Sequence, residues 1–594
     1  MPASKLLAFD LQDIIPITDS QVLVVNRRTL KRGVIDRQLL PLLGLCEYYR
    51  NADEHQATLA TQLTDANSAD TILTPLLSNL IEQGILVSAE QWLQQFPEPS
   101  EAQTPDWVLA IMTCDRPRLL QRVLHSALPH LRTIEHPPSQ ILLLDDSRDS
   151  EHRVDNQRYW SEWLEQVALP GSYWDRDART HYCQRLKDTL ASAEAATVDW
   201  LLSPEAFPAD EPTPGQNRNL ALLLSAGQRL LIMDDDCILT PQAHPQINNQ
   251  YLQVGAHPLK AIPFVDQAEL ATAMQALDLN PLNAHLRYLG NNFKQVFTHR
   301  QQPVHDPTWL RALDPVTRKR LGPQATVGVT LNATCGDPGT AQMNWLYTRR
   351  ADCHSDIAAY LQRIPKRSPT QRLFWRGRYQ PLLTYADTLM TTTLTGLDNR
   401  LLLPCVNPYG RNEDQMLGQG LQALYPQALF FADSWSLPHQ PEPARYWQRP
   451  TLGAPSPEPN PIEFLAQVME RGLHPTLHDP SSRLACIAYH YKDLATLNQS
   501  ELIAELNRQH FSVTAAYMQT YTINHAVAPS GSSQWQRDLT LLIDQAKQNM
   551  TQTLSLSSEW LDHFRQLSRN YGKALLLWPQ LRQRAEQARP SRSG

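Results

Sequence analysis

The sequence lacks several features that would place it in a specialised class of protein. Its eight cysteines are scattered and none forms a Cys-x-x-Cys pair, so zinc and dithiol redox motifs are not supported. This cysteine usage is typical of a reduced, cytoplasmic setting. No uninterrupted apolar run reaches about 18 residues, and the first residues lack the charged-then-apolar pattern of a signal peptide. We therefore expect no membrane span and no secretion signal.

The charge of the chain gives no indication of a nucleic-acid partner. There are 53 Lys and Arg against 60 Asp and Glu, the formal net charge is -7, and no block of basic residues occurs. Apolar residues make up 42% of the chain, which is ordinary for a globular protein. A length of 594 residues predicts about three or four domains.

The first 95 residues are expected to form a small domain. Strands are predicted at 21–26 ("QVLVVN") and 85–89 ("ILVSA"). Apolar residues at helical spacing predict three helices between these strands, at 36–49, 54–63 and 69–84. This order of elements is typical of a winged helix. The proline-containing segment 95–106 ("QFPEPSEAQTPD") predicts a linker to the next domain.

Residues 106–447 alternate between strand-like and helix-like segments. The apolar runs "WVLAIMT", "QILLLDDS" and "RLLIMDDD" predict strands at 107–113, 140–147 and 229–236. Helices are predicted at 116–131 and 216–227. This alternation predicts an α/β fold with a mostly parallel sheet flanked by helices. In such sheets, ligands bind beyond the carboxyl ends of the strands.

The strand predicted at 229–236 ends in three consecutive aspartates, Asp234, Asp235 and Asp236. Neighbouring carboxylates repel one another unless a cation neutralises them, and Mg²⁺ and Mn²⁺ are hard ions that prefer oxygen ligands. Such an ion can act as a Lewis acid on a departing diphosphate. The cluster therefore predicts a metal at the edge of the sheet. The alternative is that strand ends simply face water and carry polar turn residues.

Three segments, taken in order, resemble those of GT-A glycosyltransferases of the family 2 type. They are "TCDRPRLLQRVLHSAL", "LLLDDSRD" and "GQNRNLALLLSAGQRLLIMDDD", and the resemblance extends from residue 107 to about 440. It implies a GT-A sheet domain, a divalent metal (Mn²⁺ or Mg²⁺) and a nucleotide-diphosphate sugar as donor. A UDP-sugar is the expected donor.

The resemblance also implies roles for individual residues. Its nucleotide contacts would be Thr113, Asp115, Arg116, Asp145, Asp146, Gly215, Arg218, Asn219, Asp234 and Asp235. Either Asp145 or Asp146 would accept a hydrogen bond from the uracil imide N–H. The metal ligands would be Asp234, Asp236 and His439. A lone histidine is often structural, and that alternative stays open for His439.

Glu413 and Asp414 begin an amphipathic segment in "NPYGRNEDQMLGQGLQALYP". The resemblance places a catalytic base at this pair, and an inverting transfer needs a carboxylate to take the acceptor's proton. We expect Asp414 to be the base, with Glu413 second. The alternative is that both acids only suit the positive end of a helix dipole.

The distance between the metal motif and the candidate base predicts an insertion. Asp236 and Asp414 are 414 − 236 = 178 residues apart. Within this span, the segments 333–344 ("ATCGDPGTAQMN") and 391–404 ("TTTLTGLDNRLLLP") are expected to shape the acceptor side. After a proline-rich segment at 448–461, residues 460–594 predict a helical C-terminal domain without chemistry of its own.

Residues 1–95 resemble the small PqqD-like domains that bind leader peptides of ribosomally made, modified peptides. The likeness lies in the order of elements and in "LLGLCEYYRNADEHQATLATQL". Winged helices that bind DNA share this order, but the helix predicted at 69–84 carries no Lys or Arg for backbone phosphates. The resemblance therefore implies a peptide partner, held by strand addition at a sheet edge.

Together, these patterns predict a metal-dependent, inverting glycosyltransferase that moves a sugar from a nucleotide-diphosphate sugar to a peptide or glycan acceptor. Two other classes remain. A nucleotidyltransferase also uses paired aspartates and a metal, but it is expected to carry a Gly-rich, Lys-bearing loop, and "TCDRPRLL" has no glycine. A non-catalytic scaffold that binds nucleotide sugars or peptides would keep the fold without metal-dependent nucleotide binding.

Overall fold

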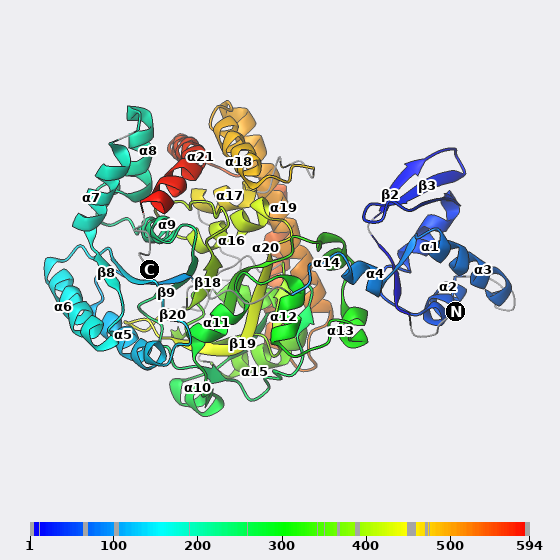
Figure 1. Cartoon of the computed structure of the whole chain (residues 1–594), viewed down its shortest axis with the longest axis horizontal. Coiled ribbons are helices and arrows are strands. Elements are labelled where there is room, and N and C mark those ends of the chain that lie inside the picture. Colours follow the sequence, from blue (N-terminus) through cyan, green and yellow to red (C-terminus); the bar gives the residue numbers. More distant parts are fainter. Residues whose placement is uncertain are drawn as a thin grey trace.

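The computed structural model shows a large body built on one mixed β-sheet, with a small N-terminal region on one side and long C-terminal helices (Figure 1). It describes residues 5–10, 12–62, 69–99, 106–188, 190–257, 259–340, 343–349, 351–364, 369–385, 393–447, 459–469, 473 and 476–588. The two predicted linkers lie largely outside these residues. Among the helices described, none combines the length and the apolar character that a membrane span needs.

The N-terminal region, blue in Figure 1, contains an antiparallel sheet of β2 (Gln12–Pro16), β3 (Gln21–Asn26) and β4 (Arg32–Asp36). A separate pair joins β1 (Leu7–Phe9) to β5 (Leu86–Ser88). The helices are α1 (Leu40–Gly44), α2 (Ala52–Ala60), α3 (Ala69–Glu82) and α4 (Ala89–Leu93). The predicted strands and three helices are present, although α1 is shorter than expected. Strands β1, β2 and β4 and helix α4 were not predicted.

The central sheet follows the order β11-β17-β19-β14-β18-β9-β6-β7-β8. Its main strands are β6 (Trp107–Thr113), β7 (Gln140–Asp145), β8 (Gly171–Trp174), β9 (Arg229–Asp234), β14 (Val327–Gly336) and β19 (Leu429–His439). These strands run in one direction, and β18 (Thr395–Asp398) lies antiparallel between β9 and β14. Their carboxyl ends therefore meet at one edge. The predicted α/β class and the three predicted strands are confirmed, although β7 and β9 each end two residues earlier than predicted.

Both faces of this sheet are covered by helices, because successive strand residues point to opposite faces. Leu109 of β6 and Leu143 of β7 belong to a core shared with α5 (Pro117–Arg132) and α6 (Ser150–Val167). Ala110 and Leu142, their neighbours, belong to a core shared with α8 (Ser192–Leu202) and α9 (Pro214–Leu224). Burial on both faces explains why these strands are continuous apolar runs.

The predicted insertion consists of short strands and helices beside β19. The strands are β10 (Gln242–Ala243), β11 (Gln253–Val254), β12 (Lys260–Pro263), β13 (Gln275–Ala276), β15 (Thr370–Gln371), β16 (Phe374–Gly377) and β17 (Leu382–Thr384). The helices are α10 (Gln267–Ala273), α11 (Pro281–Tyr288), α12 (Phe293–His299), α13 (Pro307–Ala312), α14 (Pro315–Arg320) and α15 (His354–Arg363). Outside the insertion lie α7 (Arg176–Lys187), α16 (Glu413–Leu424) and β20 (Tyr446–Trp447).

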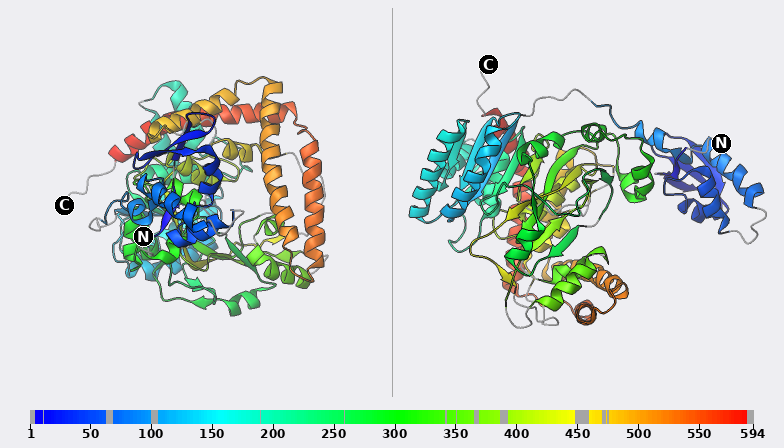
Figure 2. Two further views of the ribbon diagram at one scale, coloured as in Figure 1. Left: turned by 90° about the vertical axis from the view of Figure 1, so that its right-hand side faces the viewer. Right: turned by 90° about the horizontal axis from the view of Figure 1, so that it is seen from below.

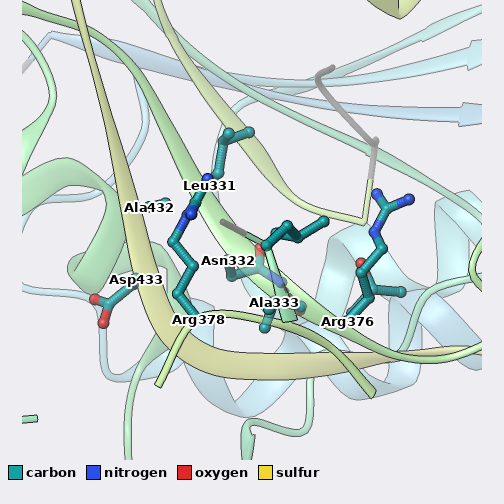
Figure 3. Close-up of a pocket in the computed structure, with 10 residues that line it drawn as sticks. Leu331, Asn332, Ala333, Arg376, Arg378, Ala432 and Asp433 are labelled. Carbon is teal, nitrogen blue, oxygen red and sulfur yellow. Dashed lines mark hydrogen bonds between the residues drawn. The ribbon is translucent and has the colours of Figure 1, made fainter. Parts of the chain in front are cut away.

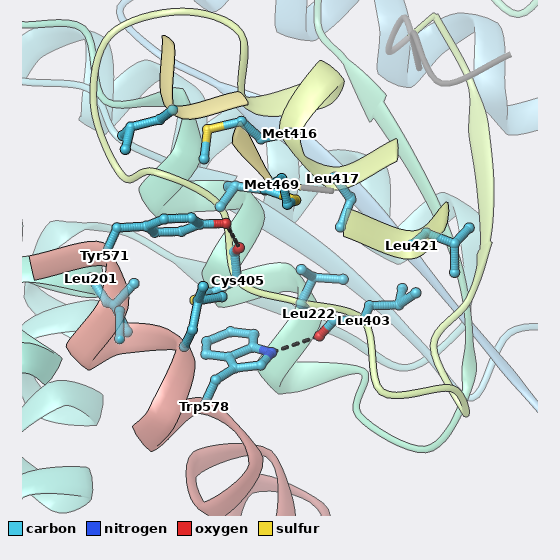
Figure 4. Packing of buried hydrophobic residues seen from close by; sticks show 14 of the residues in the cluster. Leu201, Leu222, Leu403, Cys405, Met416, Leu417, Leu421, Met469, Tyr571 and Trp578 are labelled. Carbon is cyan, nitrogen blue, oxygen red and sulfur yellow. Dashed lines mark hydrogen bonds between the residues drawn. The ribbon is translucent and has the colours of Figure 1, made fainter. Parts of the chain in front are cut away.

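The C-terminal helices are α17 (Pro461–Val468), α18 (Pro480–Leu494), α19 (Gln499–Ala526), α20 (Ser533–Thr551) and α21 (Ser558–Gln587). Helices α19 and α20 form a long hairpin at the side of the body (Figure 2). Helix α21 enters the main core, where Tyr571 Oη donates to Cys405 O at 2.9 Å and Trp578 Nε1 donates to Leu403 O at 2.7 Å (Figure 4). The C-terminal helices thus support the segment that leads into α16.

A buried interface joins the N-terminal region to helices α12 to α14. The rings of Trp92 and Phe96 lie 6.1 Å and 4.5 Å from that of Phe293, centroid to centroid. Arg318 Nε lies 3.2 Å from Asp10 Oδ1, and both side chains are buried. Helix α14 precedes the start of β14, so the N-terminal region is attached at the amino ends of the strands. The end of the N-terminal region, at Trp92 and Phe96, is therefore packed against these helices.

Candidate active site

The candidate site lies where the order of the strands reverses. Strand β6 has β7 on one side and β9 on the other. Open α/β sheets bind ligands in the crevice beyond the carboxyl ends at such a point. Met112 of β6 pairs in register with Asp234, the last residue of β9. The sheet therefore brings the segment that begins at Thr113 next to the three aspartates.

Asp235, the middle aspartate, turns inward from this edge. Thr113 Oγ1 donates to Asp235 Oδ2 at 2.6 Å, and Arg116 Nη2 lies 2.8 Å from Asp235 Oδ1. Burial raises the pKa of Asp235 to about 7, while the positive charge of Arg116 acts in the opposite direction. Because Asp235 is fully buried, it ties the loop after β6 to the end of β9 and does not reach solvent.

Asp236 and His439 face each other across the end of the sheet. Asp236 Oδ1 lies 3.2 Å from His439 Nε2. The other ring nitrogen of His439, Nδ1, donates to Asp337 O at 2.6 Å. Burial acts to lower the pKa of His439, but the charges of Asp236 and Asp337 outweigh burial and raise that pKa, which favours the charged imidazole with Nε2–H toward Asp236. Burial acts to raise the pKa of Asp236, but His439, Arg116 and Arg445 outweigh burial and hold that pKa well below its usual range.

Asp236 and His439 could supply part of the coordination of a divalent ion. One carboxylate oxygen and one imidazole nitrogen converge, and the backbone carbonyl that orients His439 is typical of a metal-ligating histidine. Within the described ranges, no group of three or more His, Cys, Asp or Glu side chains is placed to enclose a metal. Mg²⁺ and Mn²⁺ commonly use one or two carboxylates and complete their coordination with water and phosphate oxygens. Asp234 is the last residue of β9, two positions before Asp236, and its side chain is half-buried.

The acidic pair predicted as the base lies at the start of α16. Asn412, with φ of 81°, turns the chain into this helix. Glu413 Oε1 lies 3.7 Å from Arg218 Nη2 of α9, and only 12% of the Glu413 side chain is exposed. Burial raises the pKa of Glu413 to about 7; the charge of Asp414 adds to this effect, and Arg218 opposes it. Asp414 has no hydrogen-bond or ion-pair partner within the part of the chain described.

Gly215 and Asn219 hold the loop before α16 against α9. A Cβ atom at Gly215 would lie 1.9 Å from Asn407 O, so only glycine allows this close approach. The amide of Asn219 accepts from Val406 N at 2.8 Å and donates to Val406 O at 3.0 Å. Arg218, between them, is 1% exposed, and its Nε and Nη1 donate no hydrogen bond within the described residues. These contacts of Gly215 and Asn219 thus place Arg218 of α9 next to Glu413.

Both acids at the end of β7, Asp145 and Asp146, are engaged by protein groups. Asp145 accepts hydrogen bonds from Ser147 N (2.8 Å), Asn156 Nδ2 (3.0 Å) and Tyr173 Oη (2.6 Å). Its bonds fix the loop that follows β7.

Asp146 binds two arginines that the sequence analysis missed. Arg176 Nη1 lies 2.9 Å from Asp146 Oδ1, Arg179 pairs with the same oxygen, and Thr213 Oγ1 donates to Asp146 Oδ2 at 2.6 Å. Both arginines lie in the first turns of α7. Their spacing, i and i+3 on one helix face, is the signal that could have indicated a shared acidic partner.

Asp115 and Arg116 occupy different parts of the loop after β6. Asp115, with φ of 52°, accepts from the backbone N–H groups of Arg148 (2.9 Å) and Asp149 (3.0 Å) through Oδ1. Arg116 instead reaches the aspartates, with Nη1 3.3 Å from Asp236 Oδ2. The structure therefore places Arg116 with Asp235, Asp236 and His439, and places Asp115 beside the end of β7.

A small cavity lies beside β14 and β19, before their carboxyl ends. It has a volume of about 40 Å³, and Figure 3 shows Asn332, Arg376, Arg378 and Asp433 around it. This volume holds about one or two water molecules, so a sugar nucleotide does not fit there. Arg376 Nη1 donates to Pro338 O at 3.2 Å and thereby steadies the loop after β14.

Comparisons with known proteins identify no family for this chain. No protein-family description matches the chain, and no curated protein matches it. Among solved structures, it is similar to a mannosyltransferase from Pyrobaculum calidifontis in complex with GDP-mannose and Mn²⁺. The identity is 12%, the match covers 80% of this chain and 94% of that chain, and the TM-score is 0.24. A TM-score this low aligns no individual residues, so residue roles rest on this chain's own geometry.

Proposed function

We propose that this protein is a metal-dependent, inverting glycosyltransferase that uses a nucleotide-diphosphate sugar as donor. The observation that carries the proposal is the convergence of Asp236 Oδ1 and His439 Nε2, 3.2 Å apart, at the switch point of a largely parallel sheet. The acidic start of α16 lies close enough that the charge of Asp234 acts on Glu413. This charge effect supports the proposal that the metal-diphosphate subsite and the base belong to one site.

Asp236 and His439 would hold the divalent ion, which supplies Lewis-acid stabilisation of the departing diphosphate. Arg116 lies beside them with a third of its side chain exposed, so its guanidinium can also donate to phosphate oxygens. The nucleotide would lie over the loops that follow β6 and β7. The proposal requires the anomeric carbon of the sugar to face the start of α16.

Asp414 is the proposed base. Its carboxylate takes the proton of the acceptor hydroxyl or thiol while the acceptor atom bonds to the anomeric carbon and the bond from that carbon to the diphosphate oxygen breaks. Its lack of a protein partner within the described residues leaves the carboxylate available to an acceptor. Glu413, which pairs with Arg218, is proposed to position the start of α16 instead.

The N-terminal region is proposed to dock a peptide acceptor. In its three-stranded sheet, β2 and β4 each pair on one side only among the described strands. Exposed apolar side chains gather on and beside β2 and β4, at Ile14, Ile15, Ile17 and Val34. An extended peptide can add to such an edge through main-chain hydrogen bonds while its side chains use the apolar surface.

The attachment of the N-terminal region sets a minimum length for such a peptide. The region contacts α12 to α14 at the amino ends of the strands, whereas the proposed metal ligands lie at the carboxyl ends. Strand β14 connects these two edges with 10 residues, a distance of about 33 Å at roughly 3.3 Å per residue. A docked acceptor therefore needs about ten or more extended residues between the docking segment and the modified residue.

A nucleotide-sugar screen tests the proposal. The protein is incubated with Mn²⁺ and UDP-glucose, UDP-N-acetylglucosamine or GDP-mannose, and free nucleotide diphosphate is measured. Metal-dependent release of the diphosphate from at least one donor is expected. Release of pyrophosphate from a nucleoside triphosphate and a sugar 1-phosphate would instead identify a nucleotidyltransferase. Binding without turnover of any donor would identify a scaffold.

A further inference from the structure

Asp337 is fixed to His439 by its backbone. Asp337 N–H donates to His439 O at 3.0 Å, and Asp337 O accepts the bond from His439 Nδ1 at 2.6 Å. The preceding Gly336 has φ of 114°, and a Cβ atom there would lie 2.4 Å from His439 O. This turn therefore places Asp337 directly beside the proposed metal ligand, and a larger residue at 336 would push it away.

The side chain of Asp337 is buried but only partly satisfied. It is 4% exposed, and Oδ1 accepts from Gly339 N at 2.7 Å. Its second oxygen, Oδ2, is buried and accepts no hydrogen bond from the residues that the structure describes. Leaving a buried carboxylate oxygen without a donor is unfavourable, and such an atom calls for a specific partner.

Arg445 connects Asp337 to the metal subsite. Its Nη1 lies 4.0 Å from Asp337 Oδ1, and its Nη2 lies 3.7 Å from Asp236 Oδ2. The segment is held in place because β20 pairs with β15 and Arg372 N–H donates to Arg445 O at 3.1 Å. The two carboxylates therefore lie on either side of one guanidinium group. A sugar attached to a diphosphate at Asp236 would extend from Asp236 toward Asp337.

We infer that Asp337 accepts a hydrogen bond from a hydroxyl or amide N–H of the donor sugar and thereby selects which sugar is transferred. This inference rests on the proposed function. A carboxylate oxygen is an acceptor only, so it favours a sugar with a donor group at that position and disfavours one that lacks it. Among the residues that the structure describes, the partners Gly339 and Arg445 both face Oδ1, so none of these residues uses Oδ2.

The test separates nucleotide binding from sugar binding. With Mn²⁺ present, isothermal titration measures the affinities of UDP, GDP, UDP-glucose, UDP-N-acetylglucosamine and GDP-mannose for the unmodified chain and for Asp337→Asn. The variant keeps one side-chain oxygen that can accept from Gly339 N–H. Its amide NH₂ group replaces the acceptor Oδ2 by a donor, and the negative charge is lost. Asp538→Asn, a buried aspartate on α20 that bonds to Tyr347, is the matched control.

The expected result is selective. Asp337→Asn should bind the bare diphosphate as the unmodified chain does, and should bind the preferred nucleotide sugar about 10- to 100-fold more weakly. Asp337→Glu, which keeps the charge but displaces it, should change the order of preference among the sugars. Equal weakening of diphosphate and nucleotide sugar, or no change in either, would assign Asp337 a purely structural role. If the unmodified chain bound none of these nucleotides, that result would contradict the proposed function itself.

Discussion

Replacing Glu413 with glutamine should remove a destabilisation that grows with pH. Burial, together with the charge of Asp414, raises the pKa of Glu413 from 4.5 to about 7 even though Arg218 opposes the change. Between these two pH values, the folded protein keeps a proton that the unfolded chain has released, so stability falls as pH rises. The rise corresponds to about 3 kcal/mol when complete, because each pKa unit is worth about 1.4 kcal/mol.

Glu413→Gln cannot ionise and therefore lacks this dependence. Relative to the unmodified chain, the variant should gain about 2 to 3 kcal/mol between pH 5 and pH 8, because part of the cost is already present at pH 5. Urea unfolding at both pH values, followed by tryptophan fluorescence, measures the gain. Glu463→Gln is the matched control, since Glu463 is an exposed glutamate in the first turn of α17.

Two results would refute this reasoning. If Glu413→Gln and the unmodified chain lost stability equally between pH 5 and pH 8, the carboxyl of Glu413 would not be the group that retains the proton. If the variant were less stable at pH 8, the ion pair with Arg218, 3.7 Å away, would outweigh the burial of the charge.

Three further predictions concern turnover, site assembly and the N-terminal region. Asp414→Asn should lower turnover by about 10²- to 10⁴-fold and leave donor affinity unchanged in steady-state kinetics and titration; a collapse of donor affinity would assign this acid to binding. Gly215→Ala should lower both stability and donor affinity, because its Cβ would lie 1.9 Å from Asn407 O; unchanged melting and binding would contradict the tight packing. Trp92→Ala should destabilise the protein by about 3 to 5 kcal/mol, because it leaves a cavity beside Phe293. Urea unfolding measures this loss, and a loss under about 1 kcal/mol would indicate an independent N-terminal domain.

The parts of the fold that could be predicted are those with strong local patterns. Strands β6, β7 and β9 are apolar on both faces because helices cover both sides of the sheet, and their runs were recognised within two residues. Strand β14 was missed although "VGVTLNAT" alternates, because its polar positions Thr330 and Asn332 lie within the protein. The alternation of apolar and other residues with a period of two is the sequence pattern that could have predicted β14.

The N-terminal interface could not be predicted from the sequence. Trp92 and Phe96 lie next to a proline-containing segment, which predicts separation of two bodies. Their partners Phe293 and Trp309 are about 200 residues later in the chain, and no local pattern links them. This packing of Trp92 against Phe293 and Trp309 is the basis of the destabilisation predicted for Trp92→Ala.

The order of motifs indicated the acids of the site but not their partners. Asp234 to Asp236 were expected at a strand end, yet the sequence could not show that Asp235 turns inward to Thr113. The partners of Asp146 come from α7, and Arg445 comes from the segment after β19. Such pairings depend on tertiary packing, since they join segments that no local periodicity relates.

The most direct test of the proposed function is metal-dependent nucleotide binding. Isothermal titration with UDP and with GDP, in Mn²⁺ and in EDTA, compares the unmodified chain with Asp236→Asn and His439→Ala. We predict that at least one nucleotide diphosphate binds only with Mn²⁺, and that both variants greatly weaken this binding, because each removes one of the two converging ligands. Equal binding in EDTA, or full Mn²⁺-dependent affinity in Asp236→Asn, would contradict a metal site at Asp236 and His439.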